Sequence, residues 1–340
     1  MCGVRGCPRK RPFGGLFRVS DKPRILVTRR HLAEIEARLQ RDYDIVLNED
    51  DHIMTASEII GAADGMDALF ICVTEPLGEK TINALPDSVQ AILTLSVGTD
   101  HIDLAAAEKR RLAVLTTPDA VTAATAEIGM LLLLGAARCA PESGRYLRAG
   151  KWQTWSPTQF VGVEITGKPL GIFGMGRIGR TVAERARGFE MKVHYRNRNR
   201  LAPDLEDNAV YFNDLGEFLA ASEFLILCAP STPETKGLLN AETIAQLPDG
   251  AIVVNIARGD LVDDAALIAA LKSGKIAAAG LDVFNGEPAN IDRRYFRLPN
   301  VFAVPHIGSA ARQARTAMGM MLLDGFEALR AGQPVSNRVV

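Results

Sequence analysis

A glycine pattern between an apolar run and a predicted helix is the feature that most limits how this chain can fold. Gly174, Gly176 and Gly179 follow directly on the apolar run 169–173 and lead into a predicted helix at 177–188. Strand, glycine turn and helix in this order belong to a parallel β-α-β unit, in which glycines allow a tight turn and a close approach of backbone to pyrophosphate. Free N–H groups and the positive dipole end of the helix also favour an anion. The pattern predicts a dinucleotide-binding turn; the alternative is an ordinary glycine-rich turn.

Short apolar runs alternate with helical segments over most of the chain. The first alternation has candidate strands at 25–28, 45–47, 68–73, 91–95 and 113–116. A long apolar helix is expected at about 122–138. An irregular segment at 151–168 contains Trp152 and Trp155, which we expect to line a pocket mouth or a subunit contact as packing residues. A second alternation starts at 169 and runs through strands near Val193, Val210, Leu225, Val253, Ala278 and Ala303. Such alternation predicts parallel sheets, and six strands make a complete dinucleotide-binding sheet.

These patterns predict an α/β fold with two Rossmann-like or flavodoxin-like doubly wound parallel-sheet domains and a cleft between them. The 340 residues suffice for two such cores. Residues 122–306 would form the dinucleotide-binding domain, and residues 21–121 plus 307–340 a discontinuous substrate domain, because the helical stretch 310–331 has no strand after it. Residues 1–20 lack the apolar core of a signal peptide and are interpreted as a loose N-terminal extension.

The composition limits the kinds of partner that this chain can be expected to bind. The hydrophobic and charged fractions, 47% and 23%, are those of a globular protein, and a formal net charge of -1 gives no general attraction to nucleic acid or anionic membranes. The longest apolar stretch, 128–137, has about half of the ~20 residues that span a bilayer and predicts a buried helix. We therefore expect neither nucleic acid nor a membrane as partner.

The cysteines indicate a reducing compartment. No C-x-x-C pair occurs, and Cys72 and Cys228 fall in predicted core strands, so reduced thiols and a cytoplasmic location are expected. Cys2 and Cys7 alone would not fill a tetrahedral metal site. We expect no bound metal.

A basic run follows the second strand of the dinucleotide-binding domain. The predicted strand at 192–195 ends in Arg196-Asn197-Arg198-Asn199-Arg200, and no carboxylate occurs before Asp204. An Asp or Glu near this point would bind a ribose 2′-hydroxyl, whereas a guanidinium pairs with a 2′-phosphate. The run therefore predicts NADP(H) as the preferred cofactor, with NAD(H) as a second one; the alternative is a solvated basic loop. His194 in this strand is expected to be packed.

Three charged side chains each follow an apolar run. Arg258 follows 251–257, Glu287 follows 276–284 and its turn, and His306 follows 301–305. Because carboxyl ends of parallel strands lie at the same edge of a sheet, a cation, a carboxylate and an imidazole should converge there. If a 2-keto acid accepts hydride, His306 can supply the proton, Glu287 can raise the histidine pKa, and Arg258 can hold the carboxylate and polarise the carbonyl.

With these residues the chain resembles the D-isomer-specific 2-hydroxyacid dehydrogenase family, from about Arg24 to its end. The matching segments are 174–179, 255–259, 280–288 and 305–308. The resemblance implies that Arg258, Glu287 and His306 are the catalytic residues. It also implies that the loop 96–103 binds substrate through Ser96, Val97 and Gly98, together with Arg258.

The loop 96–103 also has an interpretation from its residues alone. A glycine turn after the strand at 91–95 can hold a carboxylate with free N–H groups. A metal site at Asp100, His101 and Asp103 is the rival, but Asp103 at the start of a helix is more simply a cap.

The resemblance further implies the cofactor contacts. Thr125 and Asp282 should lie near the nicotinamide and residues 229–235 near the adenosine, although Asp282 could instead cap a loop and Ser231 and Thr235 could be turn residues. The residues expected to bind the cofactor are Thr125, Gly174, Met175, Gly176, Arg177, Ile178, Gly179, Arg196, Asn197, Arg198, Ala229, Pro230, Ser231, Thr235, Ile256, Ala257, Asp282, His306 and Gly308.

Within the family, the chain is most similar to glyoxylate/hydroxypyruvate reductases, including the 2-ketogluconate reductase branch. The resemblance implies NADPH-dependent reduction of glyoxylate, hydroxypyruvate or 2-ketogluconate to D-2-hydroxy acids, by a homodimer joined through the dinucleotide-binding domain. The alternatives are another D-2-hydroxyacid dehydrogenase, a phosphite dehydrogenase, or a non-catalytic corepressor-like protein that senses dinucleotides.

Overall fold

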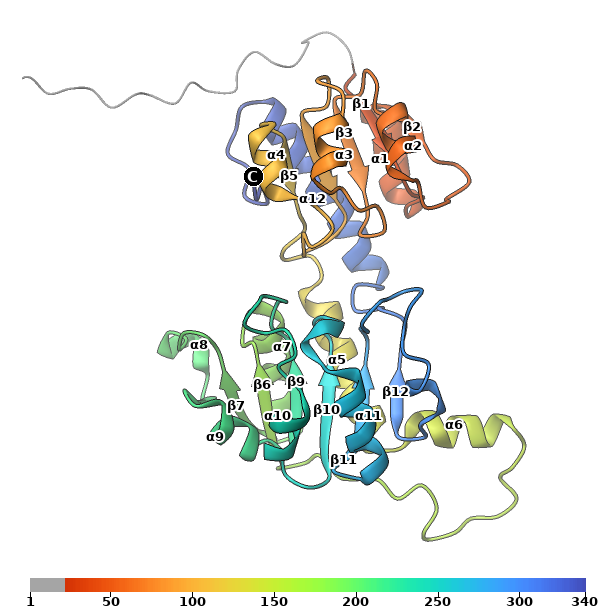
Figure 1. Cartoon of the computed structure of the whole chain (residues 1–340), viewed down its shortest axis with the longest axis vertical. Coiled ribbons are helices and arrows are strands. Elements are labelled where there is room, and N and C mark those ends of the chain that lie inside the picture. The colour runs from red at the N-terminus through yellow and green to blue at the C-terminus, as the bar shows by residue number, and fades with distance from the viewer. Residues whose placement is uncertain (1–21) are drawn as a thin grey trace, which may run out of the picture. The chain divides into compact units, whose positions relative to one another are not determined.

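The computed structural model describes residues 22–340, which fall into two compact units (Figure 1). The first unit contains the chain up to Ala120 together with Arg312–Val340, and the second contains Val121–Ala311. The expected N-terminal extension at 1–20, with Cys2 and Cys7, lies outside the described residues.

A five-stranded parallel sheet forms the middle of the first unit. Its strand order is β2-β1-β3-β4-β5, the flavodoxin-like arrangement, which reverses between β1 and β3. The inner strands β3 and β4 are fully buried, mostly apolar runs because both faces of the sheet are covered there, whereas no residue of the edge strand β2 is buried. They are β1 (Arg24–Val27), β2 (Asp44–Leu47), β3 (Ala68–Ile71), β4 (Ala91–Thr94) and β5 (Ala113–Leu115).

Helices cover both faces of this sheet. Leu39 of α1 and Phe326 of α12 pack on one face, and Ile59 of α2 and Ile82 of α3 pack on the other. Met318 of α12 is buried, whereas Met320 and Met321 are only partly buried. The helices are α1 (Ala33–Asp42), α2 (Ala56–Ala62), α3 (Glu79–Ala84), α4 (Leu104–Lys109) and α12 (Arg312–Arg330).

The second unit is built on a seven-stranded parallel sheet with the order β12-β11-β10-β9-β6-β7-β8. This is the Rossmann order with one strand added at the edge. Each of the seven strands lies at a position named from the sequence, the run 169–173 and the six after it, so only the count of six was one too few. Its strands are β6 (Pro169–Phe173), β7 (Lys192–Arg196), β8 (Val210–Tyr211), β9 (Phe224–Leu227), β10 (Ala251–Asn255), β11 (Ile276–Leu281) and β12 (Val301–Ala303). Its helices are α5 (Thr122–Ala137), α6 (Ala140–Arg148), α7 (Arg177–Arg187), α8 (Pro203–Glu206), α9 (Leu215–Ala220), α10 (Ala241–Gln246) and α11 (Asp264–Ser273), and its short 3₁₀ turns are η1 (Gly259–Leu261) and η2 (Tyr295–Arg297).

Helix α5 confirms the expected buried apolar helix. Leu132 and Leu133 are fully buried, and the helix packs on β10, β11 and α7. Within residues 22–340 no single helix has the length and apolar character to cross a membrane, and only the pair α5–α6, bent by 70°, meets those criteria together. Trp152 and Trp155 do not pack within the unit: they are 55% and 73% exposed.

Residues 307–311 lie with the second unit, whereas the sequence analysis placed the crossing between the domains at 306/307. The cause is a pair of hydrogen bonds. The N–H groups of Ile307 and Gly308 donate to the two carboxylate oxygens of Asp282, at 2.6 and 2.9 Å. Residues 307–308 are therefore fixed to the end of β11, and the crossing comes only where α12 begins.

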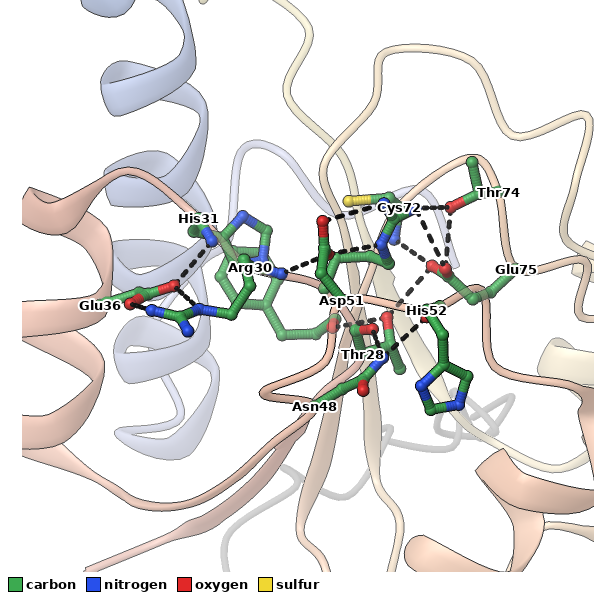
Figure 2. A network of polar contacts seen from close by, with 12 residues as sticks. Thr28, Arg30, His31, Glu36, Asn48, Asp51, His52, Cys72, Thr74 and Glu75 are labelled. Carbon is green, nitrogen blue, oxygen red and sulfur yellow. Dashed lines mark hydrogen bonds and ion pairs between the residues drawn. The ribbon is translucent and has the colours of Figure 1, made fainter. Parts of the chain in front are cut away.

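A buried carboxylate closes the point where the strand order of the first sheet reverses (Figure 2). Glu75 has no exposed surface, and its Oε2 accepts from the Thr28 hydroxyl at 3.1 Å and from the Cys72 N–H at 2.9 Å. Its Oε1 accepts from the Thr74 hydroxyl at 2.8 Å. The Cys72 N–H thus donates to a side chain and not to a neighbouring strand, which explains why β3 ends at Ile71 and not at residue 73. At this reversal point the Glu75 carboxylate is therefore satisfied by groups of its own unit.

Substitution of Glu75 tests this tie. Glu75→Gln should lower the free energy of unfolding by about 1–3 kcal/mol, because one amide cannot accept every hydrogen bond that the carboxylate accepts. Denaturant unfolding of the full chain measures the loss. Glu108→Gln, at an exposed position of α4, is the control and should change it by less than about 0.5 kcal/mol. Equal stability of the two variants would contradict the role of Glu75.

Candidate active site

The glycine turn lies where the strand order of the second sheet reverses, between β6 and β9. Gly174 has a φ of +98°, and a Cβ there would lie 2.4 Å from the N of Ala229. A Cβ on Gly179 would lie 2.4 Å from the Gly174 carbonyl oxygen, so this glycine allows α7 to pack on the turn. A Cβ on Gly176 would meet nothing within 4 Å. The turn therefore leaves open backbone at the helix N-terminus, which fits a pyrophosphate.

His306 and Glu287 form the centre of the candidate site. His306 Nδ1 donates to Glu287 Oε1 at 2.5 Å, and Glu287 Oε2 accepts from the Phe284 N–H at 2.9 Å. Because a carboxylate only accepts, Nδ1 carries a hydrogen and Nε2 remains to exchange a proton with a ligand. The hydrogen bond that His306 donates to Glu287 raises the pKa of His306 above its usual value, against the opposing effect of burial. The histidine side chain is 46% exposed, so it is accessible.

Asp282 holds the loop that carries His306. Its carboxylate is 1% exposed and accepts from the N–H groups of Ile307 and Gly308, while its carbonyl oxygen accepts from the His306 N–H at 2.8 Å. His306 has a φ of +49°, a conformation that side chains other than glycine adopt rarely. Burial raises the pKa of Asp282. The loop-cap interpretation of Asp282 thus holds, and its contact with a nicotinamide stays a prediction.

Arg258 is positioned by the segment at the end of β10. Asn255 Nδ2 donates to the Arg258 carbonyl oxygen at 2.8 Å, and Asn255 Oδ1 accepts from the Ala257 N–H at 3.0 Å. The charge of Arg258 opposes the raised pKa of His306, so the guanidinium lies within electrostatic reach of the imidazole. A Cβ on Gly259 would lie 2.0 Å from the carbonyl carbon of Phe284. Only glycine lets the arginine turn approach the Phe284–Glu287 segment this closely.

The expected cofactor residues of the second unit surround the glycine turn and the His306 loop. Thr125 is buried and donates to the Gly308 carbonyl oxygen at 3.3 Å. Asn197 Oδ1 accepts from the Met175 N–H at 2.6 Å, which joins the basic run to the glycine turn. His194 is buried and hydrogen-bonded to the Ser222 hydroxyl at 2.8 Å, as a packed residue should be.

The expected adenosine segment, residues 229–235, is held by side-chain hydrogen bonds. The Ser231 hydroxyl donates to Asp260 Oδ2 at 2.7 Å, and the Thr235 hydroxyl donates to the Pro230 carbonyl oxygen at 2.8 Å. Both are therefore turn-forming residues in this structure. Ile256 and Ala257 are buried directly before the Arg258 turn.

The expected substrate loop lies in the first unit and is braced from within. The Ser96 hydroxyl donates to the Gly98 carbonyl oxygen at 2.7 Å, and Thr94 Oγ1 contacts His101 Nε2 at 2.8 Å. Within residues 22–340, the N–H groups of Val97 and Gly98 have no hydrogen-bond acceptor. This loop therefore offers backbone N–H groups to a ligand, whereas the Ser96 hydroxyl is used within the loop.

The rival metal site in this loop gains no support. Asp103 caps α4 by accepting from the Ala106 N–H at 2.9 Å, as the cap interpretation predicted. Over the described part of the chain, no group of three or more His, Cys, Asp or Glu could hold a metal ion.

Several residues that position the charged side chains of the site were not predicted from the sequence. Asn255 was recognised only as part of a matching segment, although an Asn directly after a buried strand is a signal for a hydrogen-bonded turn. Gly259 was likewise recognised only as part of that segment, and Asp260 gave no signal, because the importance of both depends on contacts with residues 25 or more positions away.

Comparisons with known proteins agree with this geometry. Residues 130–308 match the model of the D-isomer specific 2-hydroxyacid dehydrogenase NAD binding domain. The chain is 44% identical over 318 residues to glycerate dehydrogenase of Hyphomicrobium methylovorum, covering 93% of this chain and 98% of that one. It is 36% identical over 316 residues to glyoxylate reductase of Pyrococcus furiosus, covering 92% and 94%.

Among solved structures, it is similar to the NADPH-dependent glyoxylate/hydroxypyruvate reductase of Sinorhizobium meliloti in complex with NADP and malonate. The TM-score is 0.82 at 29% identity, over 94% of this chain and 97% of that one.

Gly259→Ala tests the close approach that positions Arg258. The added methyl group should push the arginine turn away from Phe284, and a displacement of about 1 Å at a catalytic site can reduce turnover on the order of 100-fold. The measurement is kcat/KM for a 2-keto acid. Gly61→Ala, whose Cβ would meet nothing within 4 Å, is the control and should keep full activity. Normal turnover by the Gly259 variant would show that the approach is not needed.

Proposed function

Because this chain belongs to the D-isomer-specific 2-hydroxyacid dehydrogenase family, we propose that it reduces small 2-keto acids to D-2-hydroxy acids with NADPH. The hydrogen bond between His306 and Glu287, with Arg258 within electrostatic reach, is the observation that carries the proposal. The substrates that we propose are glyoxylate and hydroxypyruvate, with 2-ketogluconate as a larger candidate. The names of the relatives support this choice: glycerate is the alcohol of the hydroxypyruvate pair, so a glycerate dehydrogenase and a hydroxypyruvate reductase interconvert the same two compounds.

The residues of the site divide the work of this reaction. Bound at the glycine turn, a reduced nicotinamide supplies the hydride that adds to the carbonyl carbon of the keto acid. His306 gives the proton on Nε2 to the carbonyl oxygen, which becomes the 2-hydroxyl group. Glu287 stabilises the imidazolium before this transfer, and Arg258 holds the substrate carboxylate and polarises the carbonyl. We assign the N–H groups of Val97 and Gly98 to the same carboxylate.

The preference for NADP(H) is part of the proposal. Its support is the basic run at the end of β7, the lack of a carboxylate between residues 196 and 203, and the NADP bound in the S. meliloti enzyme. NAD(H) remains the second cofactor. The cytoplasmic location expected from the cysteines also stays a proposal.

A substrate panel tests the activity. Oxidation of NADPH or NADH is followed at the nicotinamide absorbance with glyoxylate, hydroxypyruvate, 2-ketogluconate and phenylpyruvate. We expect turnover of hydroxypyruvate and glyoxylate, and a loss of most turnover in His306→Ala with unchanged dinucleotide binding. Full activity of His306→Ala would remove His306 from the mechanism, and no turnover of any keto acid would favour a binding protein.

Glu287→Gln tests how the histidine is tuned. Reduction needs protonated His306, so kcat/KM should be full at pH below the raised pKa of His306 and fall as pH rises through it. The neutral amide cannot stabilise the imidazolium as a carboxylate does, so the pKa of His306 should be lower in the variant. The kcat/KM of the variant should therefore fall at a lower pH than that of the wild type. The measurement is the pH profile of kcat/KM, with Glu108→Gln as control. Coincident profiles would contradict the tuning role.

We also propose a homodimer formed through the second unit. Its support is a group of exposed apolar side chains on α6, on η2 and in the segment after α6: Leu147, Trp152, Trp155, Val161 and Phe296 are each at least half exposed. Exposed apolar side chains that form one contiguous patch mark protein interfaces, and we propose that these five residues do so.

Sedimentation of dilution series tests the dimer. Trp155→Ser should raise the dissociation constant by about tenfold or more, because a buried aromatic residue contributes strongly to an interface. Val46→Ser in the first unit is the control and should leave it unchanged. A wild-type protein that sediments as a monomer at all concentrations would refute the dimer.

A further inference from the structure

The three arginines of the basic run, Arg196 at the end of β7 and Arg198 and Arg200 in the loop after it, differ in their contacts. Arg200 makes two hydrogen bonds to the carboxylate of Glu206: Nε contacts Oε1 at 2.8 Å and Nη2 contacts Oε2 at 3.0 Å. Arg196 donates to the carbonyl oxygen of Asn197. Arg198 is exposed, and no residue in the range 22–340 accepts a hydrogen bond from its guanidinium, although its charge is within electrostatic reach of Glu234. Of the three, Arg200 is the one whose planar fork is occupied by a carboxylate.

Glu206 is held from a second side as well. It is 8% exposed, and its Oε1 also accepts from the Tyr195 hydroxyl at 2.5 Å. The same hydroxyl accepts from the Leu201 N–H at 3.0 Å. Arg200, and to a smaller extent Tyr195, lower the pKa of Glu206 to about 2. The loop between β7 and α8 therefore closes on an ionised carboxylate.

This loop is attached to the glycine turn. Gly174 donates its N–H to the Arg196 carbonyl oxygen at 3.0 Å, and Met175 donates its N–H to the Asn197 side chain. In a Rossmann unit the adenosine ribose lies beside the turn, at the end of the second strand, which here is β7. A negative charge in the loop after β7 would repel a 2′-phosphate if no cation compensated it.

We propose that Arg200 supports recognition of a 2′-phosphate as a positioning residue, by pairing with Glu206, while Arg198 contacts the phosphate. The pair of Arg200 and Glu206 is neutral and shapes the loop, so that the Arg198 guanidinium is the available charge. The inference rests on the proposed preference for NADP(H) and assigns the preference to one arginine of the run.

If Arg200 acts only by compensating the charge of Glu206, it should not be needed for binding of a 2′-phosphate once Glu206 is also neutral. Arg200→Gln leaves the Glu206 charge uncompensated and should weaken binding of a 2′-phosphate. The double variant Arg200→Gln/Glu206→Gln removes that charge and should restore it. An arginine that contacted the phosphate itself could not be replaced in this way.

The experiment measures dissociation constants of adenosine 2′,5′-bisphosphate and of 5′-AMP by calorimetry on the full chain. The ratio of the two constants isolates the contribution of the 2′-phosphate. We expect Arg198→Gln to reduce the preference roughly 10- to 100-fold, as the loss of charge-assisted hydrogen bonds does. Arg200→Gln should reduce it about tenfold or more, and the double variant should return to within about threefold of the wild type. Arg200→Lys, which keeps the charge, should also stay within about threefold.

An exposed ion pair elsewhere in the second unit provides the matched control. Lys168 Nζ contacts Glu223 Oε2 at 3.0 Å, and Lys168 precedes β6, at the opposite end of the strand from the glycine turn. Lys168→Gln and Lys168→Gln/Glu223→Gln should leave the ratio unchanged. A double variant at Arg200 and Glu206 that binds as weakly as Arg200→Gln would overturn the proposal, as would an Arg200→Gln variant that binds like the wild type.

Failure of the cofactor proposal is recognised separately. If the wild type binds both nucleotides equally, the preference for NADP(H) is refuted. The uncompensated Glu206 of Arg200→Gln should then still create a preference for 5′-AMP, which the double variant abolishes. If Arg200→Gln also bound the two nucleotides equally, the proposed role of Arg200 in compensating Glu206 would be refuted. Where Arg200→Gln does not fold, Arg200→Lys alone decides: it must keep the wild-type ratio.

Discussion

The two hydrogen bonds that Asp282 accepts from Ile307 and Gly308 are the interaction on which the catalytic arrangement depends. They fix the two residues that directly follow His306, which itself lies in the left-handed region. Held in this way, its ring meets Glu287, which comes from a loop that is itself fixed by the Phe284 N–H.

The first unit uses a similar device for a different purpose. Glu75, like Asp282, is a buried carboxylate at the carboxyl edge of a parallel sheet and is satisfied by groups of its own unit. There the carboxylate fills the reversal point of the sheet, while in the second unit that point is occupied by glycines that leave backbone open. Two sheets of related topology thus differ in what their edges offer: one edge is closed by side chains, and the other presents a turn that fits a pyrophosphate.

Prediction from the sequence was most accurate where one residue type has one physical use. Apolar runs gave the strands to within one or two residues, because covered parallel strands must be apolar on both faces. Strand ends were less accurate, since the N–H of Cys72 pairs with a side chain in place of a strand. Even the two-residue edge strand β8 was located, near Val210. Trp152 and Trp155 are exposed in the single chain, and their place at a pocket mouth or a subunit contact stays a prediction.

The sequence by itself determined the family, the two parallel α/β units, and a cation, a carboxylate and an imidazole that each follow an apolar run. These depend on local chain order, because a strand followed by a charged residue places that residue at the carboxyl edge wherever the strand lies in the sheet. Tertiary structure alone decided which polar groups are already paired. Arg200 and Arg198 are two residues apart and look alike in the sequence, yet one is bound to Glu206 and the other is not. Pairing depends on side chains brought together from separate turns and strands, and no local pattern records it.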